Sequence, residues 1–306
     1  MNWNLARKAE RLATRAAVLQ KTRIFFIQRG YLEVDTPCLI PAPAPEAHID
    51  AVVAGSLYLQ TSPELCMKRL LAAGYSRLFQ ICHCWRANER GSRHLPEFTM
   101  LEWYRSGSDY NYLMGEAVEL LTEIASSYCC QEGYLAVKGT RIAMNGEWER
   151  ITVRDAFRRY TETSMEEALA ADEFDRLMTE CIEPFLGLKQ PTVIYDYPAE
   201  RAALARIKGD DPSVAERFEL YIAGMELANA FSELTDEKIQ RQRFIAESHQ
   251  RTARNAPPYP LPEIFLAEIG SMPPSAGIAL GVDRLIMLLS GTDTIDDVVA
   301  FTPEEM

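Results

Sequence analysis

Apolar and polar positions along the chain recur in patterns that predict both helices and strands. Over residues 5–29 the apolar residues recur at helical spacing and Gly30 provides a stop, so we expect one amphipathic helix there. Residues 31–36 then alternate as a strand does, and Pro37 ends that pattern. Residues 192–197 predict another strand.

Helices are predicted between and after the strands. Asp109 is a good N-cap residue, and the apolar repeat that follows predicts a helix to about Tyr128. Residues 152–183 predict two or three helices, and residues 235–254 predict a charged one. Residues 277–290 predict a strand that leads directly into a helix.

Two further segments predict paired strands. Residues 79–104 hold two alternating runs on either side of a short charged loop. Residues 216–233 predict a hairpin that turns near residues 223–224, which would place Tyr221 opposite Glu226.

No segment indicates a domain boundary. The proline-rich tract at residues 41–45 predicts an extended surface loop, because ordered-looking sequence resumes at once. Strands with helices packed around them fit the α+β class. We therefore expect residues 1–306 to form a single domain, an antiparallel β-sheet flanked by helices.

The amino-acid composition limits the classes of partner that the protein is expected to bind. The chain is 47% hydrophobic and 25% charged, as an ordinary globular protein is, and its net charge is −12. An acidic surface fits a basic protein partner or a cationic substrate better than a long nucleic-acid face. The seven cysteines have no spacing typical of a secreted scaffold, and neither a signal peptide nor a membrane span is evident. We expect a cytoplasmic protein without membrane association.

The charged loop within residues 79–104 carries groups that suit phosphate. Arg86 ends the first strand, and Arg93 and His94 close the loop. Guanidinium groups bind phosphate because their planar donors form bidentate pairs. The alternative interpretation is two surface arginines on a turn.

One face of the second strand carries Phe98, Glu102 and Tyr104. Phe98 and Glu102 lie roughly 13 Å apart, at ~3.3 Å per residue. An aromatic ring could then stack on a base while a carboxylate reaches an amine several bonds away. The alternative is an edge strand with a surface glutamate.

The hairpin at residues 216–233 gathers carboxylates. Glu219 and Glu226 lie diagonally on one face and would repel each other unless a cation such as Mg²⁺ lies between them. The later polar residues of the hairpin have the opposite parity, so they reach the same site only if the strand has a bulge near residues 227–228. These residues are Asn229, Phe231 and Glu233. The alternative is a half-solvated hairpin.

Small residues form the strand before the last apolar helix. Gly277, Ala279 and Gly281 would let a ligand approach the backbone, and Arg284 in the first helical turn could meet a triphosphate. The alternative is a buried pair of Asp283 with Arg284.

The sequence Cys82-His83-Cys84 suggests a metal site only superficially. In a strand, His83 faces away from both cysteines, so the three side chains do not converge. Cys82 and Cys84 are instead expected on the face of Arg86.

In this order, the segments resemble the motifs of class II aminoacyl-tRNA synthetases. Residues 22–37, with the sequence GYLEVDTP at their end, resemble motif 1, which forms the dimer interface of those enzymes. Residues 79–104 resemble motif 2 in its lysine-branch variant, and residues 277–290 resemble motif 3. Residues 216–234 resemble the matching region of lysyl-tRNA synthetases, and the whole resemblance covers about residues 10–302.

Within this class, the chain is most similar to the elongation factor P–lysine ligase family, a synthetase paralogue reduced to the catalytic core. Lysyl-tRNA synthetases carry an anticodon-binding domain before motif 1, and no such domain is expected here because motif 1 begins around residue 22. The resemblance implies that ATP, with Mg²⁺, activates lysine or (R)-β-lysine. The activated amino acid would pass to a lysine side chain of elongation factor P, with no tRNA acceptor, and the enzyme would be a homodimer through the motif 1 region.

The resemblance also implies residue roles. The catalytic residues would be Arg86, which holds the α-phosphate and the substrate carboxylate, and Arg284, which holds the outer phosphates together with His94. Phe98 would stack on adenine, and Glu219 and Glu226 would bind Mg²⁺. Further ATP contacts are expected from Asn88, Glu89, Arg93 and Glu219. Substrate contacts are expected from Glu102, Tyr104 and Glu233 to the side-chain ammonium, from Asn229 to the carboxylate, and from Glu64 to the α- or β-amino group.

Two positions depart from the lysyl-tRNA synthetase pattern. Asn88 replaces a motif 2 glutamate, and Glu89 could substitute for it. Ala279 replaces a glycine, and its methyl group would reshape the pocket in a way that could favour a β-amino acid.

Three other functions fit the same motifs. The chain could be a compact lysyl-tRNA synthetase, a paralogue that makes a free amino-acid amide or peptide, or a binding module without catalysis. The acidic composition argues against the first, and the retained Arg86, Glu219, Glu226 and Arg284 argue against the last.

Overall fold

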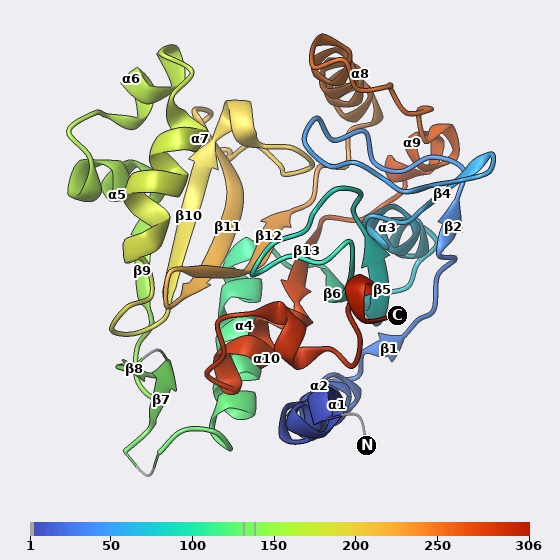
Figure 1. Cartoon of the computed structure of the whole chain (residues 1–306). Coiled ribbons are helices and arrows are strands. Elements are labelled where there is room, and N and C mark those ends of the chain that lie inside the picture. The colour runs from blue at the N-terminus through green and yellow to red at the C-terminus, as the bar shows by residue number, and fades with distance from the viewer. Residues whose placement is uncertain (1–2, 131, 138) are drawn as a thin grey trace.

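An eight-stranded sheet organises the computed structural model, which describes residues 3–130, 132–137 and 139–306 (Figure 1). Neighbouring strands are antiparallel except at the two edges, where β1 pairs with β5 and β9 with β10 in parallel. The α+β class and the antiparallel sheet are therefore confirmed. In spatial order the strands are β1 (Leu32–Glu33), β5 (Arg77–Trp85), β6 (Glu97–Ser106), β13 (Ser275–Gly281), β12 (Met225–Ser232), β11 (Val214–Ile222), β10 (Thr192–Pro198) and β9 (Glu149–Thr152).

The two faces of the sheet have different roles because side chains alternate along each strand. On β6, Leu101 and Trp103 enter the main hydrophobic core, whereas Glu102 and Tyr104 point to the opposite face. The core face packs against α2 (Ala9–Gln28), α4 (Tyr110–Ala125) and α10 (Val282–Leu289). The opposite face is therefore the one on which the strands can present polar groups to a ligand.

The predicted helices are present with small changes. The Asp109 carboxylate accepts a hydrogen bond from the backbone N–H of Tyr112 at 3.0 Å and caps α4. Residues 152–183 form three α-helices and a π-helical turn, which lie beside β9 and β10 (Figure 1). These are α5 (Val153–Tyr160), α6 (Met165–Ala170), α7 (Phe174–Leu177) and the π-helix Met178–Ile182. The charged helix is α8 (Glu237–Ala253), and it packs on α9 (Glu263–Ile269), which in turn packs on α3 (Glu64–Ala72).

The N-terminal helix differs from the prediction. The helix expected over residues 5–29 is divided at Lys8 into α1 (Trp3–Arg7) and α2. The backbone N–H of Lys8 bonds to the carbonyl three residues back, and its buried ammonium lies 2.8 Å from a carboxylate oxygen of Glu305. The apolar periodicity did not predict this break in the helix, because the break coincides with an ion pair between Lys8 and Glu305, near the opposite end of the chain.

The strand expected over residues 31–36 is also shorter than predicted. Only β1 pairs with β5 in the ladder, and Val34 adds one more hydrogen bond to Phe79. Pro37 cannot donate, and it restricts the residue before it. Two small sheets were not predicted: β2 (Leu39–Ile40), β4 (Leu57–Leu59) and β3 (Val53–Ala54) in one, and β7 (Tyr134–Val137) with β8 (Thr140–Ala143) in the other. Within the described residues, no helix has the length and apolarity needed to traverse a bilayer.

Candidate active site

A cavity of about 210 Å³ lies against the polar face of the sheet. Its walls come from the loop between β5 and β6, from β12 and β13, and from the start of α10. It brings together residues that are far apart in sequence and that were predicted to bind the nucleotide, the metal ion or the amino acid. These are Arg86, Glu89, Arg93, His94, Phe98, Glu226, Asn229, Ala279 and Arg284.

Arg86 brings to the cavity a buried donor that has no partner in the described part of the chain. Its Nε atom is buried and has no hydrogen-bond partner among the described residues. Its guanidinium carbon lies 5.1 Å from the centroid of the Phe98 ring. A buried donor without a partner is unfavourable by about 1–3 kcal/mol, so the geometry favours an anionic ligand at this position.

Arg284 and His94 form a second cationic group in the cavity. One guanidinium nitrogen of Arg284 donates to the carbonyl and the carboxylate of Glu226, at 3.0 and 3.1 Å. The other lies 2.6 Å from Nε2 of His94. Burial and the neighbouring Arg284 lower the pKa of His94, so the neutral ring accepts this hydrogen bond. The predicted Asp283–Arg284 alternative is wrong, because Asp283 pairs instead with Arg15 of α2.

Asp283 connects the motif 2 and motif 3 segments to α2. It accepts hydrogen bonds from Arg15 and, at 2.6 Å, from the backbone N–H of Thr99 on β6. Arg15 also donates to the hydroxyl of Thr99. The start of α10, which carries Arg284, is thereby fixed to α2 and β6.

The bulge expected on the hairpin is present and explains the position of Glu226. Tyr221 pairs with Glu226 and Leu220 with Ala228, so Leu227 is the extra residue. The extra residue changes the parity of β12, and Glu226 and Asn229 both line the cavity. The strands β11 and β12, the turn at Ala223 and this register are confirmed as predicted.

Glu219 is held by protein groups. Its two carboxylate oxygens accept hydrogen bonds from Arg217 at 2.6 Å and from the hydroxyl of Tyr221 at 2.8 Å. Arg217 also donates to the side-chain oxygen of Asn229 at 3.1 Å. Burial, followed by repulsion from the nearby Glu226, raises the pKa of Glu219.

A group of acidic side chains, here termed the acidic pocket, borders the cavity without lining it and consists of Glu64, Glu102, Glu233 and the side chains between them. Glu102 faces Ala279 across the β6–β13 ladder. Its carboxylate accepts hydrogen bonds from the hydroxyls of Ser62 at 2.5 Å and Tyr104 at 2.8 Å. Burial, followed by repulsion from Glu64, raises the pKa of Glu102 to about 8.

Glu233 is the other deep carboxylate of the acidic pocket. It is 1% exposed, and neither of its oxygens has an aligned hydrogen-bond donor among the described residues. Burial raises its pKa to about 8, although Lys68 opposes the shift. A Cβ atom at Gly277 would lie 2.4 Å from a Glu233 oxygen and 2.2 Å from the Tyr104 ring, so only glycine leaves room for both.

Three residues around the site were not identified from the sequence. Lys68 is buried between Glu64 and Glu233, Ser62 holds Glu102, and Glu46 lines the cavity. Burial and Glu64 raise the pKa of Glu46 to about 7. The spacing of Glu64 and Lys68, one helical turn apart, was the available signal for an ion pair, but such pairs are usually on the surface.

Asn88 does not line the cavity, whereas Glu89 does. Asn88 is exposed and has a φ of 66°, in the left-handed region that asparagine adopts more readily than glutamate. The replacement of glutamate by asparagine thus has a conformational reason in this turn.

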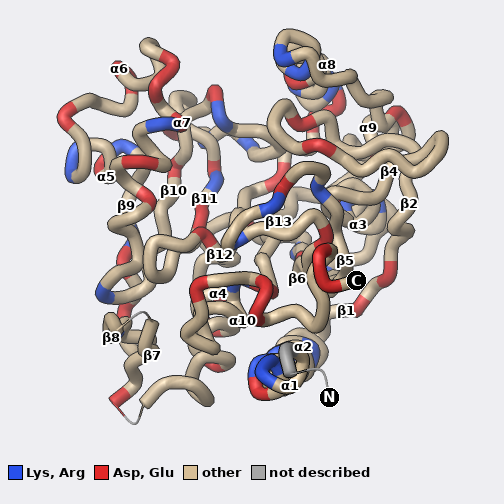
Figure 2. Tube along the Cα trace, viewed as in Figure 1, with Lys and Arg blue, Asp and Glu red and all other residues tan. Residues whose placement is uncertain are grey.

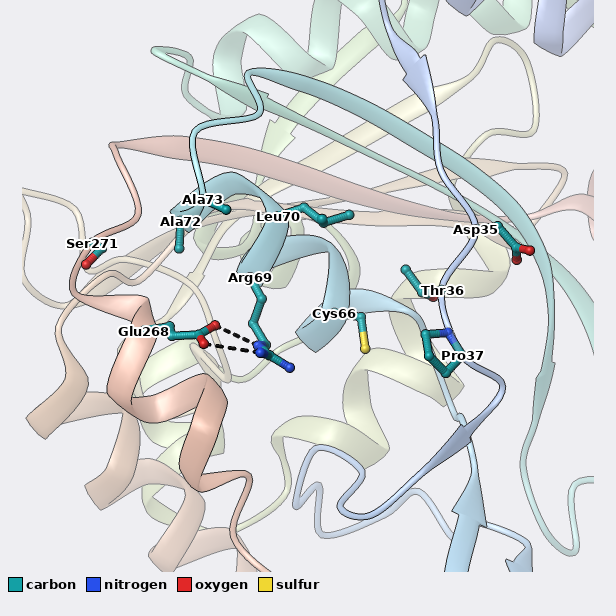
Figure 3. Close-up of a pocket in the computed structure, with 10 residues that line it drawn as sticks. All are labelled: Asp35, Thr36, Pro37, Cys66, Arg69, Leu70, Ala72, Ala73, Glu268 and Ser271. Carbon is teal, nitrogen blue, oxygen red and sulfur yellow. Dashed lines mark hydrogen bonds and ion pairs between the residues drawn. The ribbon is translucent and has the colours of Figure 1, made fainter.

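A second, larger cavity of about 550 Å³ lies beside α3 (Figure 3). Its lining includes Thr36, Pro37, Cys66 and the ion pair of Arg69 with Glu268. It contains none of the residues predicted for the active site.

Comparisons with known proteins agree with the motifs. Residues 2–305 match the family model of tRNA synthetases class II (D, K and N). The elongation factor P–(R)-β-lysine ligase of Salmonella paratyphi B is 39% identical over 333 aligned positions, which cover 98% of this chain and 97% of that protein. The proteins of the same name from Salmonella heidelberg and Salmonella enteritidis show the same identity and coverage.

Proposed function

The chain belongs to the class II tRNA synthetase family, and from that premise we propose that it activates a lysine isomer with ATP and transfers it to a protein. As a ligase-like member of this family, it uses ATP. The preferred amino acid would be (R)-β-lysine or lysine, and the acceptor a lysine side chain of elongation factor P. The names of its relatives and the position of Ala279 beside the acidic pocket support this choice.

The observation that carries the proposal is the pairing of two sites with opposite charge. Arg86 offers a buried donor without a partner in the nucleotide cavity, and the acidic pocket offers the buried carboxyl groups of Glu102 and Glu233, for which Lys68 is the only nearby ammonium among the described residues. Buried charged groups are stable when a partner satisfies them. An ATP α-phosphate at the first site and an amino-acid ammonium at the second satisfy both.

In the first step, the carboxylate of the amino acid attacks the α-phosphorus of ATP, and the bond to pyrophosphate breaks. The protein contributes position and charge: Arg86 contacts the α-phosphate and the attacking carboxylate, and Arg284 with His94 contacts the outer phosphates. Phe98 would stack on the adenine ring. Asn229, oriented by Arg217, would hold the substrate carboxylate.

We propose Glu219 and Glu226 as the Mg²⁺ ligands. Mg²⁺ commonly uses one or two carboxylates together with substrate phosphates. Glu226 lines the cavity, and the Glu219 carboxylate beside it would have to exchange its contact with Arg217 or Tyr221 for the ion. Among the described residues, no group of three or more His, Cys, Asp or Glu side chains is placed to hold a metal ion, so substrate phosphates would have to supply the remaining ligands. When bound, the ion would neutralise charge on the phosphates.

In the second step, an acceptor amine attacks the carbonyl carbon of the aminoacyl-adenylate, AMP leaves, and the amine loses a proton. The net charge of −12 favours a basic protein partner over tRNA. In the view of Figure 2, acidic and basic residues interleave over the described chain without a continuous basic stripe. The seven cysteines are free, which suits the cytoplasm, where translation takes place.

We also propose a homodimer through the motif 1 region. The strand β1 is an edge of the main sheet, and large apolar side chains are exposed on it and on the preceding helix. Ile24, Ile27 and Leu32 are 50%, 59% and 49% exposed. Exposed apolar groups next to an unpaired strand edge favour association with a second copy.

The test is ATP–pyrophosphate exchange with a panel of lysine isomers, followed by mass measurement of elongation factor P and of tRNA after incubation. We expect exchange with a lysine isomer and a mass increase of elongation factor P alone. Aminoacylated tRNA without modified protein would identify a compact synthetase, modification of small amines alone would identify an amide-forming enzyme, and the absence of exchange would indicate a binding module.

A further inference from the structure

Lys68 is enclosed by the acidic pocket. Its side chain is 0% exposed, and its Nζ atom lies 2.6 Å from a Glu64 oxygen and 2.5 Å from a Glu233 oxygen. The same atom lies 5.0 Å from the centroid of the Phe231 ring. Burial lowers the pKa of Lys68, but the two carboxylates outweigh this effect and raise it overall, so the lysine remains charged.

The charged groups that face one another here form a small set. Glu64 and Lys68 come from α3, Glu102 from β6, and Glu233 from the residue after β12. Tyr104 from β6 also faces them, and burial with Glu102 raises its pKa well above the usual value, so its hydroxyl is neutral. Glu46 also acts on Glu64, but it lies in the nucleotide cavity with Arg86, whose charge opposes its own. The three carboxylates and one ammonium of the acidic pocket itself have a charge of −2 when all four are ionised.

We propose that Lys68 determines substrate specificity by setting the charge of the acidic pocket to the value that two ammonium groups neutralise. This inference deepens the proposed function and rests on it. A diamino acid brings two ammonium groups, whereas a monoamino acid of the same length brings one and leaves a carboxylate unbalanced. Lys68 thus allows all three carboxylates to be ionised while a diamino acid is bound. Its ammonium also contacts one oxygen of Glu64 and one of Glu233 and so fixes the orientation of both carboxylates.

Without Lys68, the same bound state has a different charge balance. Three carboxylates against two ammonium groups leave one buried negative charge without a partner, which is strongly unfavourable. One carboxyl group would therefore keep its proton and lose a charge-assisted contact with the substrate. Hydrogen bonds to charged groups contribute more than neutral ones, so the loss would weaken lysine binding by about tenfold or more.

The test compares Lys68→Met with wild-type protein and with Arg69→Met as the matched control. Arg69 is the next residue of the same helix, but it pairs with Glu268 in the other cavity (Figure 3). The KM values for the lysine isomer and for ATP come from pyrophosphate exchange. The protons released on lysine binding come from calorimetry at pH 7 in buffers with different ionisation enthalpies.

For Lys68→Met we expect a KM for lysine about tenfold higher or more, an ATP KM within about twofold, and about one fewer proton released on lysine binding. Arg69→Met should match wild type in its KM for lysine, its KM for ATP and the number of protons released on lysine binding. Unchanged lysine KM and proton release in Lys68→Met would overturn the inference, as would a loss of folding in both Lys68→Met and Lys68→Gln, because Lys68 would then be a structural ion pair only. No exchange by the wild-type protein would instead reject the proposed function.

Discussion

Replacing Glu233 with glutamine should make the substrate-free protein more stable relative to wild type as the pH rises. The Glu233 carboxyl has a pKa of about 8 in the folded protein, chiefly because it is buried, against an ordinary value of 4.5. A raised carboxyl pKa means that the folded state binds the proton more tightly than the unfolded state. The stability associated with this proton is fully present below pH 4.5 and is lost as the pH rises towards 8.

The size of the effect follows from the two pKa values. One pKa unit corresponds to about 1.36 kcal/mol, so the wild-type protein should lose about 3 kcal/mol from this group between pH 5.5 and pH 8. Glutamine does not titrate, so the variant should gain that amount relative to wild type over the same range. Ionisation of the unfolded carboxyl accounts for the smaller change below pH 5.5.

Urea unfolding of both proteins at a series of pH values measures this difference. Glu10→Gln, a substitution at an exposed position of α2, is the control and should follow wild type at every pH. The same Glu233→Gln variant should have a higher KM for lysine, because it removes the carboxylate proposed to contact the substrate ammonium. Parallel pH curves for Glu233→Gln and wild type would refute the reasoning.

Three further predictions address other parts of the site. Arg86→Ala should reduce pyrophosphate exchange by roughly 10²–10³, the effect of removing one preorganised donor, and an unchanged rate would mean that Arg86 does not contact the reacting groups. Ala279→Gly should shift the ratio of kcat/KM from (R)-β-lysine towards lysine, by about tenfold as for one added or lost methylene, and a constant ratio would remove Ala279 from the specificity determinants. Leu32→Asp should shift the dimer towards monomer in light scattering, because it places a charge on the exposed sheet edge; an unchanged mass would place the interface elsewhere.

Much of the fold was predictable because its signals are local. The hairpin, the Asp109 cap and the strand leading into α10 each depend on alternation, on one capping residue or on small residues within a single segment. The bulge at Leu227 was predictable for a different reason. The site residues of β12 have mixed parity, and only an extra residue brings them to one face.

The missed features depend on contacts between distant segments. The helix break at Lys8 accompanies an ion pair with Glu305, and Asp283 pairs with Arg15 rather than with its neighbour Arg284. Nothing in a periodic pattern distinguishes an exposed lysine from one that the fold encloses. Lys68 was therefore indistinguishable from a surface residue of α3 until the strands that carry Glu102 and Glu233 were in place.

The raised carboxyl pKa values explain how the site combines selectivity with a folded scaffold. In the substrate-free protein, burial raises the pKa of both Glu102 and Glu233 to about 8. Ionisation of these two carboxyl groups therefore lowers the free energy of unfolding. A bound ammonium lowers both pKa values and restores that stability, since a ligand stabilises the state to which it binds. An uncharged analogue cannot do this and leaves the carboxyl groups protonated or unpaired. Selection of the substrate and relief of the buried charge would thus be the same interaction, and we expect the pocket to discriminate against amino acids that lack the second ammonium.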